Sequence, residues 1–385
     1  MKELRFHGQA IVTGRGSVEC LKNLPIGRAF IVTGGSSVVK NGMLAKIEGL
    51  LAAKGCQTLV YSGVPKNPPV ETVVEGIARM REFAPDTVIG IGGGSAIDAS
   101  KVMSVFYEHP GLDVAAAFRQ AIPQKREKIK LIAIPGTSGT ASEVTCFAVL
   151  TYRGEDLKVG GKSPAFVPDY AILDADMTLS MPKNVAAETG MDAMAHAVEC
   201  YTNPALDDFT DAMAAGAIEG LFRHLPASVT TGEPGAREKV HNYQCLAGCA
   251  FANVGTGLDH GIAHAFGGKY DLGHGLVIAV ALPYVLEFNS RDASVREKLA
   301  RLAKRVDRGD FVAAIRELNT LLGIPASFKA WASAKPTSPP TSPSLSKTRS
   351  KARPESIPSP YRRTTCRLFC APSTKAGAFN NKTQY

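Results

Sequence analysis

Short apolar runs alternate with segments of helical periodicity between Ala29 and about residue 150. The runs at 29–33, 58–61, 87–91 and 131–134 have the length of buried strands. Between two of them, Val73, Val74, Ile77 and Met80 recur at the spacing of one helix face. This alternation predicts a mostly parallel sheet with helices on both faces, and ligands bind such sheets beyond the carboxyl ends of the strands.

The pattern changes at about residue 182. Strand-like runs stop, and Ala-rich segments of helical period follow at 184–202, 207–224, 236–252, 258–267, 275–289, 294–306 and 311–322. We therefore expect an α/β dinucleotide-binding domain over residues 1–181 and an all-helical, metal-binding domain over residues 182–330. In the first domain, one helix is expected to run from the turn at 34–37 through Leu51.

Composition excludes several classes of protein. The chain has 385 residues, of which 45% are hydrophobic and 21% charged, as in soluble globular proteins. Its apolar runs are shorter than the roughly 18 residues that a membrane span needs, so no membrane partner is expected. The polar N-terminus does not resemble a signal peptide, so we expect a cytoplasmic protein, and scattered cysteines fit reduced core positions.

The net charge of +9 arises in the last segment. Residues 331–385 hold ten of the 44 basic residues and one acid, Glu355, so the remainder of the chain has equal numbers of basic and acidic residues. We therefore expect no nucleic-acid partner. The segment is rich in Ser, Pro and Thr, and we predict that it is a disordered tail. Its abrupt start suggests a shifted reading frame, which translation of the other frames past codon 330 would test.

Candidate metal ligands recur four residues apart. Asp192 and His196 form one such pair, and His260 and His264 form another, so each pair shares one face of a helix. His274 follows a Gly-rich turn. A carboxylate with several imidazoles in apolar surroundings is a donor set for a divalent transition metal. The spacing leaves the ligands open: Asp192, His196, His260 and either His264 or His274 would serve.

Two loops have the composition of phosphate-binding turns. Gly92-Gly93-Gly94-Ser95 follows an apolar run and opens a helix, so backbone N–H groups and the helix dipole could hold a pyrophosphate. It lacks the Gly-x-Gly-x-x-Gly fingerprint, and a tight turn without ligand is the alternative. A second loop, rich in hydroxyl groups at Thr137, Ser138 and Thr140, follows another predicted strand and favours a nucleotide.

Together these segments resemble the iron-containing (group III) alcohol dehydrogenases. The matching segments lie in the family's order over residues 1 to about 328: Gly92–Asp98, Pro135–Thr145, Gly190–Glu199 and Asp259–Gly275. The resemblance implies the dehydroquinate synthase-like fold of that family, with a catalytic metal between the two domains. It implies Asp192, His196, His260 and His274 as metal ligands, and His264 as a catalytic histidine near the nicotinamide. It implies two sets of cofactor-binding residues: Gly92, Gly93, Gly94, Ser95 and Asp98 on the pyrophosphate side, and Thr137, Ser138, Thr140 and Lys158 on the nicotinamide side.

The resemblance also sets expectations for cofactor, substrate and assembly. Members that prefer NAD often carry an Asp after the first strand, whereas this chain has Gly34-Gly35-Ser36-Ser37, which leaves room for a 2′-phosphate, with Lys40 close by. We therefore expect NADP(H) rather than NAD(H). The expected metal is Fe(II), although zinc accepts the same ligands. The expected reaction is hydride transfer between the cofactor and a small primary alcohol or aldehyde, in a homodimer.

Three alternatives remain open. One is a zinc-dependent polyol dehydrogenase of the glycerol type. Another is a dehydroquinate-synthase-like lyase, although the segment from Gly257 to Ala265 lacks the basic residues that a phosphorylated substrate would need. The third is a nucleotide-binding protein without turnover, because the family's closing helices are not recognisable after Ala330. A separate departure is Gly273, which stands where many members have Pro before the third ligand histidine and is expected to loosen that turn.

Overall fold

The computed structural model describes residues 3–155, 157–270 and 272–334. Its main sheet has six strands in the order β1-β8-β5-β4-β2-β3, and every pair in it is parallel. The strands are β1 Ala10–Thr13, β2 Arg28–Thr33, β3 Gln57–Tyr61, β4 Thr87–Gly92, β5 Lys130–Pro135 and β8 Tyr170–Leu173. A separate antiparallel hairpin joins β6 Phe147–Tyr152 to β7 Leu157–Lys162.

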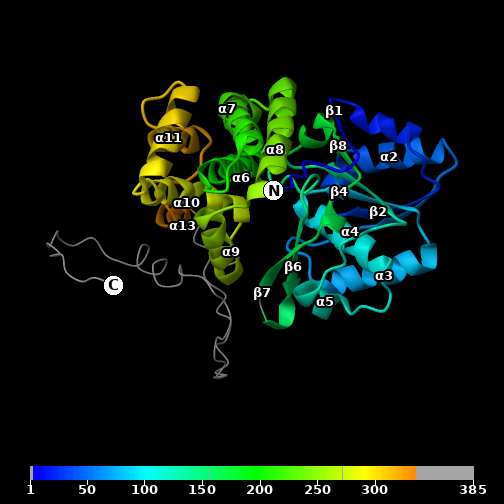
Figure 1. The fold of residues 1–385 in the computed structure, drawn as a ribbon. Helices are drawn as coiled ribbons and strands as arrows, with labels where there is room; N and C mark the ends of the chain where they lie inside the picture. Colours follow the sequence, from blue (N-terminus) through cyan, green and yellow to red (C-terminus); the bar gives the residue numbers. More distant parts are fainter. Residues whose placement is uncertain (1–2, 156, 271, 335–385) are drawn as a thin grey trace. The chain divides into compact units, whose positions relative to one another are not determined.

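Helices cover both faces of the sheet (Figure 1). They are α1 Ser37–Lys40, α2 Met43–Ala52, α3 Val70–Phe83, α4 Gly94–Tyr107 and α5 Val114–Gln120. Side chains of β2 alternate between two cores, with Phe30 and Val32 packed against α3 and α4, and Ala29 and Ile31 packed against α2. The α/β fold predicted from the apolar runs is therefore confirmed.

The remaining elements up to Ala334 are helical, apart from short turns. They are α6 Lys183–Thr202, α7 Asp208–Thr230, α8 Pro234–Val254, α9 Leu258–Tyr270, α10 His274–Asn289, α11 Ala293–Arg305, α12 Phe311–Leu321 and α13 Phe328–Ala334. Helix α6 is central and is buried against α7, α8 and α10. The all-helical second part is confirmed, whereas the domain boundary at residue 181 stays a prediction.

A proline inside α10 explains one buried contact. Pro283 has no N–H to donate to the carbonyl of Ala279, four residues earlier. The side-chain amide of Asn319, on α12, donates to that carbonyl instead, at 2.6 Å. The contact satisfies a buried acceptor and fixes α12 against α10.

Two boundaries differ from the sequence-based expectation. The helix expected through Leu51 is divided, because Gly42 adopts a left-handed conformation (φ 77°) between α1 and α2. Helical structure also extends through Ala334, past the expected start of the tail at Trp331. Phe328 stacks on Phe266 with ring centroids 5.8 Å apart, and Trp331 packs against the core. The rest of the predicted tail, residues 335–385, lies outside the described residues.

Among the described helices, none combines the length and apolar character needed to cross a membrane. The six cysteines in this part of the chain are free thiols, as expected, and four of them are buried.

Candidate metal and dinucleotide site

One face of α6 carries the acid around which the candidate site forms. Asp192, His196 and Glu199 lie about one helical turn apart on that face. Asp192 meets one histidine from α9 and one from α10. Its Oδ1 lies 3.6 Å from Nε2 of His260 and 3.5 Å from Nε2 of His274. These three side chains form a group whose ligand atoms all lie within 4.8 Å of one another.

The geometry of this group fits a shared cation. Both distances are too long for hydrogen bonds, and Asp192 Oδ1 and His260 Nε2 are buried without a hydrogen-bond partner. Two donors each about 2.1 Å from a tetrahedrally coordinated ion would lie roughly 3.4 Å apart. Buried polar atoms without a partner are costly, and a divalent ion would satisfy both at once.

His196, the fourth predicted ligand, lies beside this group rather than in it. Its ring stacks between Phe251 and His260, with centroid distances of 4.2 and 4.3 Å. Its Nδ1 is buried and has no hydrogen-bond partner. Burial lowers the pKa of His196 to about 3, so the imidazole is neutral, as a metal ligand must be.

Glu199 orients one histidine of the group, a role that the sequence reading missed. Its carboxylate accepts from Nδ1 of His260 at 2.5 Å and from the backbone N–H of Asp259 at 2.7 Å. A carboxylate that accepts a hydrogen bond from Nδ1 fixes the tautomer in which Nε2 keeps its lone pair and can bind a metal. Burial lowers the pKa of His260, but the Asp192 and Glu199 carboxylates outweigh burial and raise it to about 10. The Asp192 and Glu199 carboxylates therefore strongly favour a positive charge at this position.

The group opens toward the α/β part of the chain. The His274 side chain is 37% exposed, against 7% for His260. His264 is exposed and lies edge-on to His274, with ring centroids 5.4 Å apart. Burial lowers the pKa of His274, and the charge of Lys158 on β7 contributes to that shift. His264 thus lies on the exposed side of the metal-ligating group, within electrostatic reach of Lys158.

The predicted phosphate loops lie side by side at the carboxyl edge of the sheet. Thr33 pairs with Ile91, and Gly92 pairs with Pro135, so β2, β4 and β5 end together. The backbone N–H of Gly136 donates to the carbonyl of Gly92 at 2.8 Å. This adjacency brings Gly34, the Gly92–Ser95 turn and the hydroxyl-rich loop to one edge, as the sequence predicted.

The N-terminus of α4 has the form of an anion site. Its N-cap is Gly93, which supplies no side-chain acceptor for the first N–H groups of the helix. A Cβ added at Gly94 would lie 2.9 Å from the side chain of Thr140, so only glycine lets the two loops approach this closely. Ser95 lies in the first turn, where its hydroxyl accepts from the backbone N–H of Asn67 at 3.3 Å.

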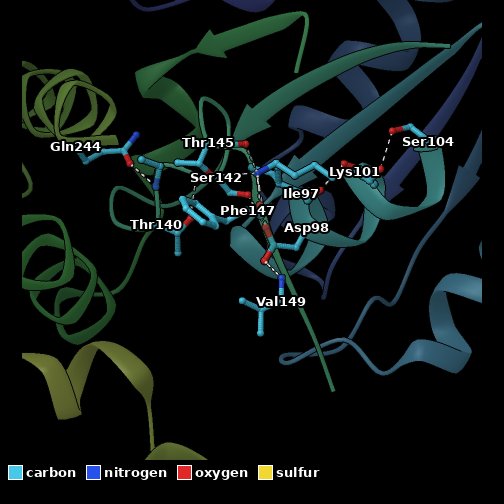
Figure 2. Close-up of polar contacts among 12 residues, drawn as sticks. Ile97, Asp98, Lys101, Ser104, Thr140, Ser142, Thr145, Phe147, Val149 and Gln244 are labelled. Carbon is cyan, nitrogen blue, oxygen red and sulfur yellow. Dashed lines mark hydrogen bonds and ion pairs between the residues drawn. The ribbon is translucent and has the colours of Figure 1, made fainter. Parts of the chain in front are cut away.

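Beyond Ser95, other predicted cofactor residues also have partners within the protein. The Asp98 carboxylate accepts from the Ser142 hydroxyl at 2.5 Å and from the backbone N–H of Val149 at 3.0 Å (Figure 2). The Ser138 hydroxyl lies 3.0 Å from Nδ1 of His241 on α8, and both side chains are buried. Their contacts hold the second loop in place.

Two protein-family models match consecutive parts of this chain. The model of the family "Iron-containing alcohol dehydrogenase" matches residues 8–175, and the model "Fe-containing alcohol dehydrogenase family, C-terminal" matches residues 186–335. Together the two models cover most of the described chain.

Individual relatives agree with the family models. An NADPH-dependent butanol dehydrogenase of Clostridium saccharobutylicum is 40% identical over 333 residues, which cover 83% of this chain and 84% of that protein. The 1-propanol dehydrogenase PduQ of Citrobacter freundii is 38% identical over 295 residues, which cover 76% of this chain and 75% of that protein. The solved structure of an iron-containing alcohol dehydrogenase from Thermococcus thioreducens matches with a TM-score of 0.78 at 36% identity, covering 84% of this chain and 86% of that one.

Proposed function

This chain belongs to the iron-containing alcohol dehydrogenase family, and on that premise we propose that it binds one Fe(II) ion and NADP(H) to interconvert a small primary alcohol and its aldehyde. The observation that carries the proposal is the meeting of Asp192, His260 and His274 from three helices. We assign these three side chains and His196 as the metal ligands. His196 stacks on His260, and its buried Nδ1 has no hydrogen-bond partner within the protein, which supports its assignment as the fourth ligand.

The chain's own residues have separate roles in this reaction. When bound, the metal would act as a Lewis acid on the substrate oxygen, and the nicotinamide would carry the hydride. Glu199 holds His260 in the ligating tautomer. The Gly92–Ser95 turn holds the pyrophosphate, and Thr137, Thr140 and Lys158 border the nicotinamide. His264, exposed beside His274, exchanges the alcohol proton with solvent.

The preference for NADP(H) rests on the turn after β2. Residues 34–41 contain no acid that could accept from an adenosine 2′-hydroxyl, and Gly35, Ser36, Ser37 and Lys40 are exposed there. A 2′-phosphate would meet hydroxyl groups and a lysine instead of a repelling carboxylate. The NADPH dependence in the name of the Clostridium saccharobutylicum relative supports this assignment.

A panel of short aldehydes tests the proposal. Protein loaded anaerobically with iron should oxidise NADPH in the presence of aldehyde with a higher kcat/KM than NADH, and zinc-loaded protein should be compared at equal metal content. A higher kcat/KM with NADH would contradict the cofactor assignment. Glycerol oxidation by the zinc form alone would favour a polyol dehydrogenase. A cofactor fluorescence change without turnover would indicate a nucleotide-binding protein.

Substitution of histidines separates metal binding from proton transfer. His260→Ala should lose metal and turnover together, because it removes a ligand. His264→Ala should retain the metal and lose rate, since it removes only the exit for the proton. Full rate in His264→Ala would refute the relay.

The homodimer implied by the family stays a prediction, which sedimentation of the metal-loaded protein checks.

A further inference from the structure

The loop 136–145 lies between the cofactor turn and the helix that carries the metal-ligating acid. On one side, Thr140 packs against Gly94 at the start of α4. On another, a Cβ at Gly139 would lie 2.9 Å from the backbone carbonyl of Thr189, one turn before Asp192 on α6. On a third, a Cβ at Gly248 of α8 would lie 2.3 Å from that of Ala141. The loop is therefore in contact with α4, α6 and α8 at once.

A buried lysine holds the end of this loop from α4 (Figure 2). The ammonium group of Lys101 donates to the carbonyl of Thr145 at 3.0 Å, to its hydroxyl at 3.2 Å and to the carbonyl of Phe147 at 2.7 Å. The side chain is fully buried, and Asp98 lies 4.0 Å away. Its three N–H donors thus have three acceptors, which is the condition for burying an ammonium without a large penalty.

A second residue of α4, Asp98, binds the loop one turn before Lys101. Asp98 accepts from Ser142 in the loop and from Val149 in β6, so the Asp98–Lys101 pair binds both the loop and the hairpin that carries Lys158. Both side chains act on protein groups rather than on the open edge of the sheet.

A buried glutamine holds the loop from α8. Gln244 accepts from the backbone N–H of Ala141 at 3.0 Å and donates to the Glu143 carboxylate at 2.6 Å. Ala141 has a positive φ of 50°, a strained conformation for a residue with a Cβ, and Gln244 bonds the N–H of that very residue. The Ser138–His241 contact adds another link to the same helix.

We propose that Lys101 and Gln244 are positioning residues for hydride transfer: by holding the loop 136–145 from opposite sides, they fix the separation between the nicotinamide and the metal. The inference rests on the proposed function. Neither residue touches the metal-ligating group, and both act through the loop. Hydride transfer depends steeply on the distance between the reacting atoms, and a displacement of about 1 Å can cost on the order of 100-fold in rate.

The test uses variants of similar size. Lys101→Met and Gln244→Leu keep the volume of the side chain and remove its hydrogen bonds to the loop. Thr145→Val removes a single acceptor and provides a milder lesion if Lys101→Met fails to fold. Ser104→Ala is the matched control, because Ser104 lies on α4 one turn after Lys101 and its hydroxyl donates only to the Lys101 carbonyl, at 2.8 Å.

Two readouts are needed. The first is kcat with cofactor deuterated at the transferred position of C4. The second is the paramagnetic relaxation of the nicotinamide C4 proton in the oxidised cofactor, with Mn(II) bound in the metal site. Relaxation falls with the sixth power of distance, so it reports the metal-to-nicotinamide separation without any turnover. Metal content is measured for each variant.

We expect Lys101→Met and Gln244→Leu to keep the metal, lose about 10- to 100-fold in kcat with a larger deuterium isotope effect, and show weaker relaxation of the C4 proton. Ser104→Ala should match the wild type in metal content, in kcat with its isotope effect, and in relaxation of the C4 proton. Wild-type relaxation and kcat in the folded loop variants, Thr145→Val included, would overturn the inference. If the wild type itself neither binds metal nor transfers hydride, the proposed function fails instead.

Discussion

Glu199 illustrates what a single residue contributes and why the sequence did not reveal it. It lies seven residues after Asp192, on the same helix face, so its proximity to the metal-ligating acid could have been read from helical spacing. Its partner, His260, is 61 residues further along the chain. Only the folded chain, which places the start of α9 beside α6, brings this buried glutamate to the ligand that it orients.

Replacing Glu199 with Gln should weaken metal binding. The amide keeps the size of the side chain but loses the charge that holds His260 in its ligating tautomer, a change that lowers metal affinity by about 10- to 100-fold in comparable sites. Competition with a chromophoric chelator measures the loss. Glu317→Gln, on the exposed face of α12, is the control and should bind metal as the wild type does. Unchanged affinity in Glu199→Gln would contradict the assigned role.

Lys101 should also make stability depend on pH in a defined direction. Burial lowers its pKa from 10.5 to about 8, against the opposing charges of Asp98, Cys146 and Glu143. Between these pH values the unfolded chain binds more protons at this site than the folded chain, so the free energy of unfolding should rise with pH. Chemical denaturation of wild type and Lys101→Met, from pH 7.5 to 10, checks this. The free energy of unfolding of the wild type minus that of Lys101→Met should increase with pH. A difference that stays constant or decreases with pH would refute this prediction.

Among the elements, those with strong periodicity were predicted well and those defined by distant pairing were not. Helix α3, Val70–Phe83, forms where Val73, Ile77 and Met80 were predicted to share one helix face, because that apolar face repeats cleanly. Strands β1 and β8 have four residues each and pair with each other across more than 150 residues of chain, so no local pattern marks them. The β6–β7 hairpin, which carries Lys158, was missed for a related reason: Gly160 and Gly161 interrupt the strand pattern of β7.

Helix α8 offers a test at this scale, because one glycine lets it approach the loop 136–145. A Cβ at Gly248 would lie 2.3 Å from the Cβ of Ala141 and 2.8 Å from Cγ2 of Val144. Gly248→Ala should therefore lower the free energy of unfolding by about 1–3 kcal/mol, as overpacking does. Gly216→Ala, on α7, is the matched control, since its Cβ would meet only Leu246 at 3.7 Å.

The free energies of unfolding of the two alanine variants should change in opposite directions relative to the wild type. Gly216→Ala should gain about 0.5–1 kcal/mol from helix propensity. Denaturant titration measures both, and equal stabilisation in the two variants would show that α8 does not press on the loop.

For the whole molecule, the sequence predicted the two-part fold and the residues that gather at the site, but not how they are held. Asp192 and His260 were visible as donors in helical spacing and His274 as a donor after a Gly-rich turn, and the structure brings the three together. The spacing alone could not choose between His264 and His274. The contacts through His241 and Gln244, each 103 residues from its loop partner, depend on the folded chain and leave no trace in local pattern.

The most direct measurement is anomalous diffraction at the iron edge from crystals grown anaerobically with Fe(II). We expect one peak, about 2.0–2.3 Å from ligand atoms of Asp192, His260 and His274, with His196 supplying the fourth donor. Iron bound elsewhere on the chain, or no peak among these side chains in protein that turns over, would contradict it.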